Sequence, residues 1–205
     1  MEHKFKRWEV ALMLGVLCAL VLGGWTAGEQ EALAGRMIRL HVIANSDSPE
    51  DQTLKLAVRD RILARAEELC PPGTTLEEAR AAMAGSLEAL AAAGRGAVAE
   101  AGYSYPVSAQ LTRCWFPTKE YGAFALPAGE YTALRVVIGE GEGRNWWCVA
   151  FPPLCLGAAS QTLEEAAQAG RFTPEQVGLM TGETGGYVLK FKGMELLGQL
   201  RELFG

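Results

Sequence analysis

The first pattern along the chain is an apolar stretch close to the N-terminus. Residues 10–28 carry no charged side chain, Val10–Leu22 carry no polar one, and two lysines and an arginine precede them. Each charge at the centre of a bilayer costs about 2.5–3.5 kcal/mol, so an apolar run behind a basic flank is typical of a segment that enters a membrane. We expect residues 1–28 to be a signal peptide or transmembrane anchor, and residues 36–205 to form one exported domain.

The length of this stretch is compatible with both fates. A strongly apolar core of 13 residues suits a signal peptide, while 19 uncharged residues approach the length that spans a bilayer. Small residues suited to cleavage occur at Thr26-Ala27-Gly28 and at Ala32-Leu33-Ala34. We favour cleavage, and retention would anchor the protein by residues 10–28. Both outcomes place the rest of the chain outside the cytoplasm.

The next segments predict a buried strand followed by an amphipathic helix. Met37–Ala44 is a short run rich in β-branched residues, and the turn that ends it offers Ser48 as an N-cap for a helix reaching about Leu69. Its inward stripe would comprise Leu54, Val58, Ile62, Ala66 and Leu69. A neighbouring charged row would comprise Asp51, Lys55 and Arg59, in which Asp51 can pair with Lys55.

A second helix and a sheet follow. Thr75 and Glu78 form a capping-box pattern at the start of one amphipathic helix. From Tyr103 the apolar period changes to two, which indicates a half-exposed antiparallel strand. Two more strands are predicted at Tyr131–Ile138 and Trp146–Phe151, and the glycine-rich connection between them favours a hairpin.

The last fifty residues complete the predicted architecture. They indicate a helix near Leu163–Ala169, a short helix from Pro174, a strand at Tyr187–Phe191 and a terminal helix. In the terminal helix the inward residues would be Leu196, Leu197, Leu200 and Leu203. The order of elements predicts an α+β domain with helices packed on a mostly antiparallel sheet.

Charge and cysteine content narrow the chemistry. The chain has a net charge of −5. Nucleic-acid binding requires a basic surface, which this composition does not provide, so no nucleic-acid partner is expected. Outside the apolar stretch lie Cys70, Cys114, Cys148 and Cys155, an even number that fits two disulfides in any of three connectivities. Cys148 and Cys155 are the favoured pair because Pro152-Pro153 bends the chain between them. A zinc site is the alternative, although no CxxC spacing is present.

No residue pattern supports a catalytic, cofactor or metal assignment. His41 is the sole histidine of the exported domain and could pair with Cys114 or Cys148, but a nucleophilic thiolate would have to escape oxidation outside the cell. A strand histidine satisfied by its neighbours is the simpler interpretation. Asp47, Glu50 and Asp51 could suggest a carboxylate metal site, yet their place at a helix N-terminus explains them as well.

Two long segments resemble a known family. They are LHVIANSDSPEDQTLKLAVRDRIL at residues 40–63 and LPAGEYTALRVVIGEGEGRNWWCVAFPPLC at residues 126–155, and both resemble stage II sporulation protein R. The resemblance extends to the N-terminal signal, the YPVSAQL strand, Phe116-Pro117 and the YVLKFKGMELLGQL ending.

The resemblance implies an exported, non-enzymatic signalling protein of endospore formation. Proteins of this family enter the space between forespore and mother-cell membranes and activate a membrane-embedded aspartic protease of the mother cell. That protease then processes a sigma factor precursor. An exported cell-envelope hydrolase or wall-binding protein remains the alternative.

Candidate partner-binding residues follow from the matching segments. They are Asn45, Ser46, Asp47, Asp51, Lys55, Arg59, Trp146 and Trp147. Adjacent tryptophans on a strand point to opposite faces, so one would be buried and the other could anchor a partner. The alternatives are that the turn only caps a helix, that the charged row is solvated, and that a loop covers the exposed ring.

Overall fold

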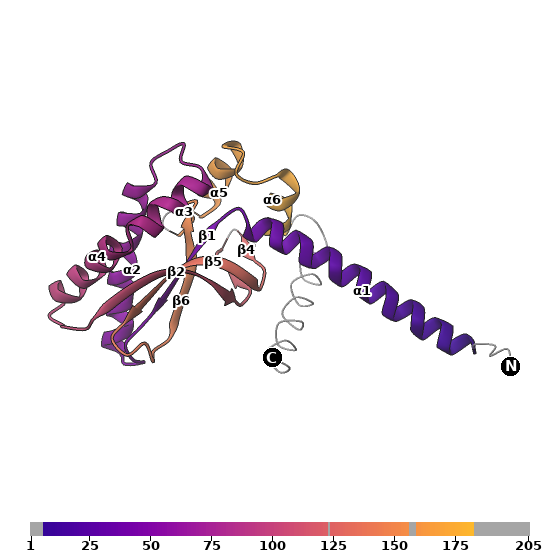
Figure 1. Cartoon of the computed structure of the whole chain (residues 1–205), viewed down its shortest axis with the longest axis horizontal. Coiled ribbons are helices and arrows are strands. Elements are labelled where there is room, and N and C mark those ends of the chain that lie inside the picture. The colour runs from indigo at the N-terminus through magenta and orange to yellow at the C-terminus, as the bar shows by residue number, and fades with distance from the viewer. Residues whose placement is uncertain (1–5, 123, 156–158, 183–205) are drawn as a thin grey trace.

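The structure is a computed structural model that describes residues 6–122, 124–155 and 159–182 (Figure 1). The helices are α1 (Arg7–Ala34), α2 (Pro49–Leu69), α3 (Leu76–Gly85), α4 (Leu87–Glu100), α5 (Ala159–Gln168) and α6 (Pro174–Thr181). The strands are β1 (Ile38–Ile43), β2 (Val107–Phe116), β3 (Lys119–Glu120), β4 (Ala125–Leu126), β5 (Gly129–Ile138) and β6 (Asn145–Phe151). The predicted strand at Tyr187–Phe191 and the terminal helix lie outside the described residues.

The main sheet confirms the predicted α+β class and corrects its topology. Its strand order is β2-β5-β1-β6, with β2·β5 and β1·β6 antiparallel and β1·β5 parallel. The hairpin expected between β5 and β6 is therefore wrong, because β1 lies between them. All six residues of β1 are buried, and the main-chain groups of a buried strand need hydrogen-bond partners, which neighbours on both of its edges supply.

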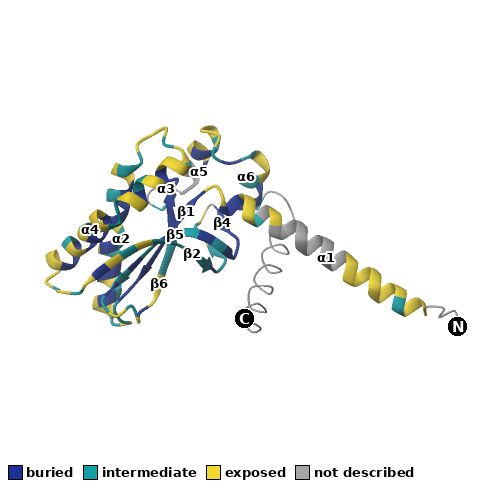
Figure 2. Ribbon diagram, in the orientation of Figure 1, coloured by how far each residue is buried: buried dark blue, intermediate teal, exposed yellow. Residues whose placement is uncertain are grey.

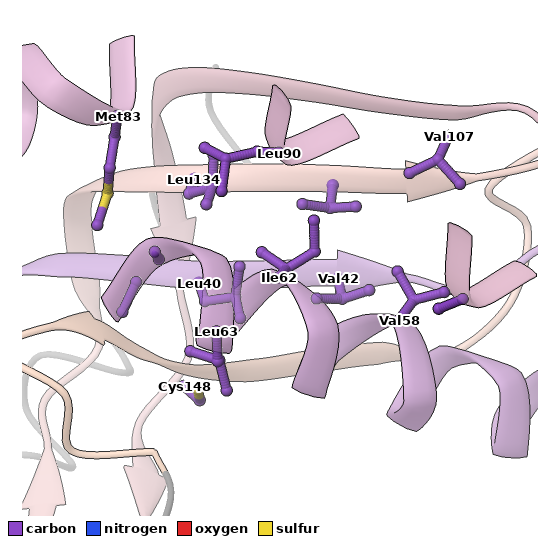
Figure 3. Close-up of a cluster of buried hydrophobic side chains, with 14 of the residues drawn as sticks. Leu40, Val42, Val58, Ile62, Leu63, Met83, Leu90, Val107, Leu134 and Cys148 are labelled. Atoms are coloured by element: carbon purple, nitrogen blue, oxygen red, sulfur yellow. The ribbon is translucent and has the colours of Figure 1, made fainter. Parts of the chain in front are cut away.

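Helices α2, α3 and α4 cover one face of this sheet. Figure 3 shows Leu40 and Val42 of β1 meeting Val58 and Ile62 of α2, all four fully buried. Each such side chain contributes about 1.5–3 kcal/mol when it is removed from water. The inward stripe predicted for α2 is thus confirmed, and Ser48 caps the helix by accepting the Asp51 N–H at 3.1 Å.

The second helical segment consists of two helices instead of one. The Thr75 capping box is present as predicted, but the helix breaks at Ser86. In α4, a Cβ at Gly94 would lie 2.9 Å from a Val107 side-chain carbon and 3.4 Å from one of Val58. Gly94 therefore lets α4 pack closely against both α2 and β2.

The opposite face of the sheet carries a second core. It is covered at one end by the last turn of α1 and by α5 and α6, and Leu33 of α1 is fully buried there. Cleavage after Ala34 would remove Leu33 from this core, so only the earlier of the two small-residue sites leaves it intact. Within the part of the chain that the structure describes, no helix is both long and apolar enough to cross a membrane.

Candidate functional site

Two loops meet where β1 ends, and we call residues 44–48 together with residues 139–144 the double loop. The first follows β1 and the second connects β5 to β6 across the end of that strand. Four hydrogen bonds join them: Glu142 N–H to Asn45 O (3.1 Å), Gly143 N–H to Ala44 O (3.0 Å), Glu140 N–H to Asn45 Oδ1 (3.1 Å) and Arg144 N–H to Asp47 Oδ1 (2.7 Å). The two segments that carry the family resemblance thus form one surface.

A buried carboxylate fixes the first half of the double loop. Asp51 is 4% exposed and accepts hydrogen bonds from Ser46 Oγ (2.5 Å) and Asn45 Nδ2 (2.8 Å). The Ser46 hydroxyl, followed by the Asn45 amide, lowers the pKa of Asp51. Asp51 therefore stays ionised and ties the turn to the first turn of α2.

Lys55 fixes the second half. Its buried ammonium donates to Gln52 Oε1 (2.6 Å) and to the main-chain oxygen of Arg144 (2.9 Å), and burial lowers the pKa of its amine. The expected Asp51–Lys55 pair is wrong, because each side chain binds other partners. The idea of a solvated row also fails for these two residues, since both are buried.

The remaining member of the row, Arg59, binds one of the two tryptophans. Its guanidinium carbon lies 4.4 Å from the centre of a Trp146 ring, a cation–π contact, and its Nη2 pairs with Asp60 at 2.6 Å. Trp146 and Trp147 point to opposite faces, as predicted, and both are half-buried. Arg59 and Trp146 extend the surface of the double loop along α2.

Trp147 stacks on His41 on the other face of the sheet. The ring centres are 3.8 Å apart at 18°, and His41 Nε2 lies 2.7 Å from Asn145 Oδ1. Burial lowers the pKa of His41, so the ring is neutral at pH 7 and we assign the proton to Nε2, which donates to the amide oxygen. His41 is thus a strand residue whose Nε2 has a hydrogen-bond partner, while its buried Nδ1 has none among the described residues.

The cysteines weaken the nucleophile hypothesis. Cys148 forms a disulfide with Cys155, with Cα atoms 5.7 Å apart, which confirms the favoured pair and removes that thiol. Cys70 and Cys114 are free, so a second disulfide is not formed, and burial raises the pKa of both thiols. Nowhere in the described ranges do three His, Cys, Asp or Glu side chains gather as metal ligands would, and Glu50 is exposed.

The disulfide should contribute measurably to stability. Because it closes a loop of sequence separation 7, we expect reduction to lower the free energy of unfolding by about 2 kcal/mol, below the value for longer loops. Thermal unfolding with and without reductant measures this. A Cys155→Ser variant is the control. Its thermal midpoint should equal that of the reduced wild-type protein and should not change when reductant is added. Equal midpoints for the wild-type protein in both conditions would refute the expectation.

Sequence reasoning missed a buried arginine. Arg39 is fully buried in β1, donates from Nε to Cys148 O (2.8 Å) and from Nη2 to Tyr121 Oη (2.5 Å), and lies over the Phe116 ring at 4.3 Å. The signal was a single charged residue inside an otherwise apolar strand. Burial also raises the pKa of nearby Tyr131 to about 12, so its phenol is neutral.

The fold and the site first define a class: a small α+β domain in which buried polar groups hold two loops in place. The family model for stage II sporulation protein R matches residues 34–161, and the chain belongs to that family. It is 41% identical over 119 residues to stage II sporulation protein R of Bacillus subtilis (strain 168), an alignment that covers 58% of this chain and 53% of the relative. The chain thus spans about half the length of that curated relative. No solved structure matches it.

Proposed function

We propose that this protein is an exported intercellular signal of endospore formation that activates a membrane-embedded aspartic protease of the mother cell by contact. The protease would then process a mother-cell sigma factor precursor. Membership of the stage II sporulation protein R family supports a role in sporulation. The observation that carries the contact mechanism is the double loop, which unites both distinctive segments in one hydrogen-bonded surface.

The energetics of the double loop favour a binding role. Burying Asp51 and Lys55 costs desolvation free energy, and apolar residues of similar size would often stabilise a fold as well or better. Here the two charges hold main-chain and side-chain groups of the loops in one arrangement. A surface ordered before binding loses less conformational entropy in the complex, which suits activation by contact.

Two further features fit a site of action outside the cytoplasm. The apolar N-terminal stretch with its basic flank has the pattern of an export signal or anchor. The Cys148–Cys155 disulfide is the kind of bond that persists in oxidising compartments. We infer that the folded domain lies in the space between the forespore and mother-cell membranes.

Reconstitution tests the proposal. The full chain is added to the outer side of membranes that contain the protease and its precursor substrate, and precursor cleavage is followed. Cleavage should require the folded protein, and Glu142→Lys, which reverses an exposed charge of the double loop, should reduce it about tenfold. Glu164→Lys, an exposed reversal on α5, is the matched control and should leave cleavage unchanged.

The alternative function gives a different result. A cell-envelope hydrolase would release fragments from purified peptidoglycan without the protease, and a wall-binding protein would sediment with it. If either result is obtained and precursor cleavage does not change when the protein is added, the proposed function is wrong and the alternative takes its place.

A further inference from the structure

The sheet face that is turned away from α2 and α4 is covered only in part by the described residues, and we call it the outer face. Its covered end contains Arg39 and Tyr131 beneath α1, α5 and α6. At the other end β2 and β6 show the colours of half-buried and exposed residues (Figure 2). By the alternation of side chains, this open end presents Ser108, Gln110, Thr112, Arg135, Val137 and Trp147.

The charge of the outer face is opposite to that of the whole protein. The chain has a net charge of −5, yet the outward positions of all four strands include no Asp or Glu. They include Arg39, Arg135 and His41. Among the strand positions of this face the two guanidinium groups therefore meet no carboxylate, so the described strands give it a positive charge.

Arg135 is the accessible charge of the open end. It is half-buried, and within the described ranges its guanidinium forms no hydrogen bond or ion pair. Its charge acts on both His41 and Cys114, lowering the pKa of each below the value that burial alone would give, so Arg135 lies over the centre of the face. A planar guanidinium is suited to bidentate binding of a carboxylate, and no described residue uses the N–H groups of Arg135.

Apolar surface surrounds this charge. Trp147 and Val137 are both half-buried, and Trp147 is held in place by its stack on His41 and its edge contact with Phe116 at 4.7 Å. A fixed aromatic ring beside an arginine that has no partner in the described part of the chain has the composition of binding hot spots, in which tryptophan and arginine are enriched.

We propose that the open end of the outer face binds an acidic segment of the partner protease, with a carboxylate on Arg135 and an apolar neighbour against Trp147 and Val137. This inference rests on the proposed function and assigns a second contact to it, on the other side of the sheet from Arg59 and Trp146. A second copy of the chain fits poorly, because a two-fold contact through this face would oppose two positive surfaces.

The test uses the full chain in the reconstituted cleavage reaction and compares three variants. Arg135→Gln should raise the concentration that gives half-maximal cleavage about tenfold, and Arg135→Lys should raise it less because the charge remains. Arg113→Gln is the matched control: it lies on the same sheet but on the opposite face, where it pairs with Glu130 at 3.4 Å. It should behave as wild type.

The outcomes separate this inference from the proposed function. If wild-type protein fails to stimulate cleavage, the proposed function is wrong. If wild type is active and Arg135→Gln matches Arg113→Gln, only the acidic-segment inference is overturned. Thermal unfolding provides a further test. A lower midpoint for Arg135→Gln, but not for Arg113→Gln, would mean that the chain's own residues occupy the outer face, which also overturns the acidic-segment inference.

Discussion

Replacing Asp51 with Ala is expected to lower the free energy of unfolding by about 3 kcal/mol at pH 7, because it removes a buried charge with its hydrogen bonds. The Ser46 hydroxyl and the Asn45 amide lose their acceptor, and the turn loses its link to α2. Urea denaturation measures the loss. Asp60→Ala on the same helix is the control, since Asp60 is 51% exposed and its pair with Arg59 should contribute at most about 1 kcal/mol.

The wild-type protein and the Asp51→Ala variant also give a test of pH dependence. The folded-state pKa of Asp51 lies below the ordinary 3.8, so its contribution is present above pH 3.8 and is lost as the pH falls through the folded-state pKa. The difference in stability between wild type and Asp51→Ala should therefore shrink as the pH falls below 3.8. A difference that stays constant in that range would contradict the role assigned to the ionised carboxylate.

Replacing Gly143 with Ala is expected to have a comparable effect, a loss of about 3 kcal/mol, because the new methyl group has no space. A Cβ at Gly143 would lie 2.2 Å from the main-chain oxygen of Ser46 and 2.8 Å from Cβ of Ala44. Neither atom is the end of a flexible side chain, so the loops must separate and stretch the 3.0 Å bond from Gly143 N–H to Ala44 O. The variant should also activate the protease less.

Gly85→Ala is the matched control for this substitution. Gly85 is the last residue of α3, and a Cβ there would have no atom within 4 Å. Alanine in a helix is favoured over glycine by about 0.5–1 kcal/mol, so this variant should be slightly more stable than wild type. If thermal unfolding shows equal effects for the two variants, the crowding argument at Gly143 is wrong.

Features set by neighbours in the sequence were predictable. The Ser48 cap, the apolar stripe of α2 and the Cys148–Cys155 pair each depend on residues within a few turns of chain. The candidate residues from Asn45 to Asp47, with Lys55 and Arg59, do lie around one surface, as the matching segments suggested. Whether they contact a partner stays a prediction.

Features that depend on distant segments were not predictable in the same way. Lys55 was expected to pair with Asp51 four residues away, but it donates to Arg144, which is 89 residues away. A local rule can weigh only i to i+4 partners and cannot see a loop that arrives from another strand. The burial of Arg39 among Phe116, Tyr121 and Tyr131 was missed for the same reason.

The sequence by itself determined the approximate positions of most helices and strands, which of their faces are apolar, and the resemblance to the family. Only the tertiary structure decided that β1 enters between β5 and β6, and that the double loop forms across its end. Hydrophobic periodicity records how deeply a strand is buried but not which strands lie beside it. That choice is made by the packing of the whole sheet, when β1 buries both faces and pairs both edges at once.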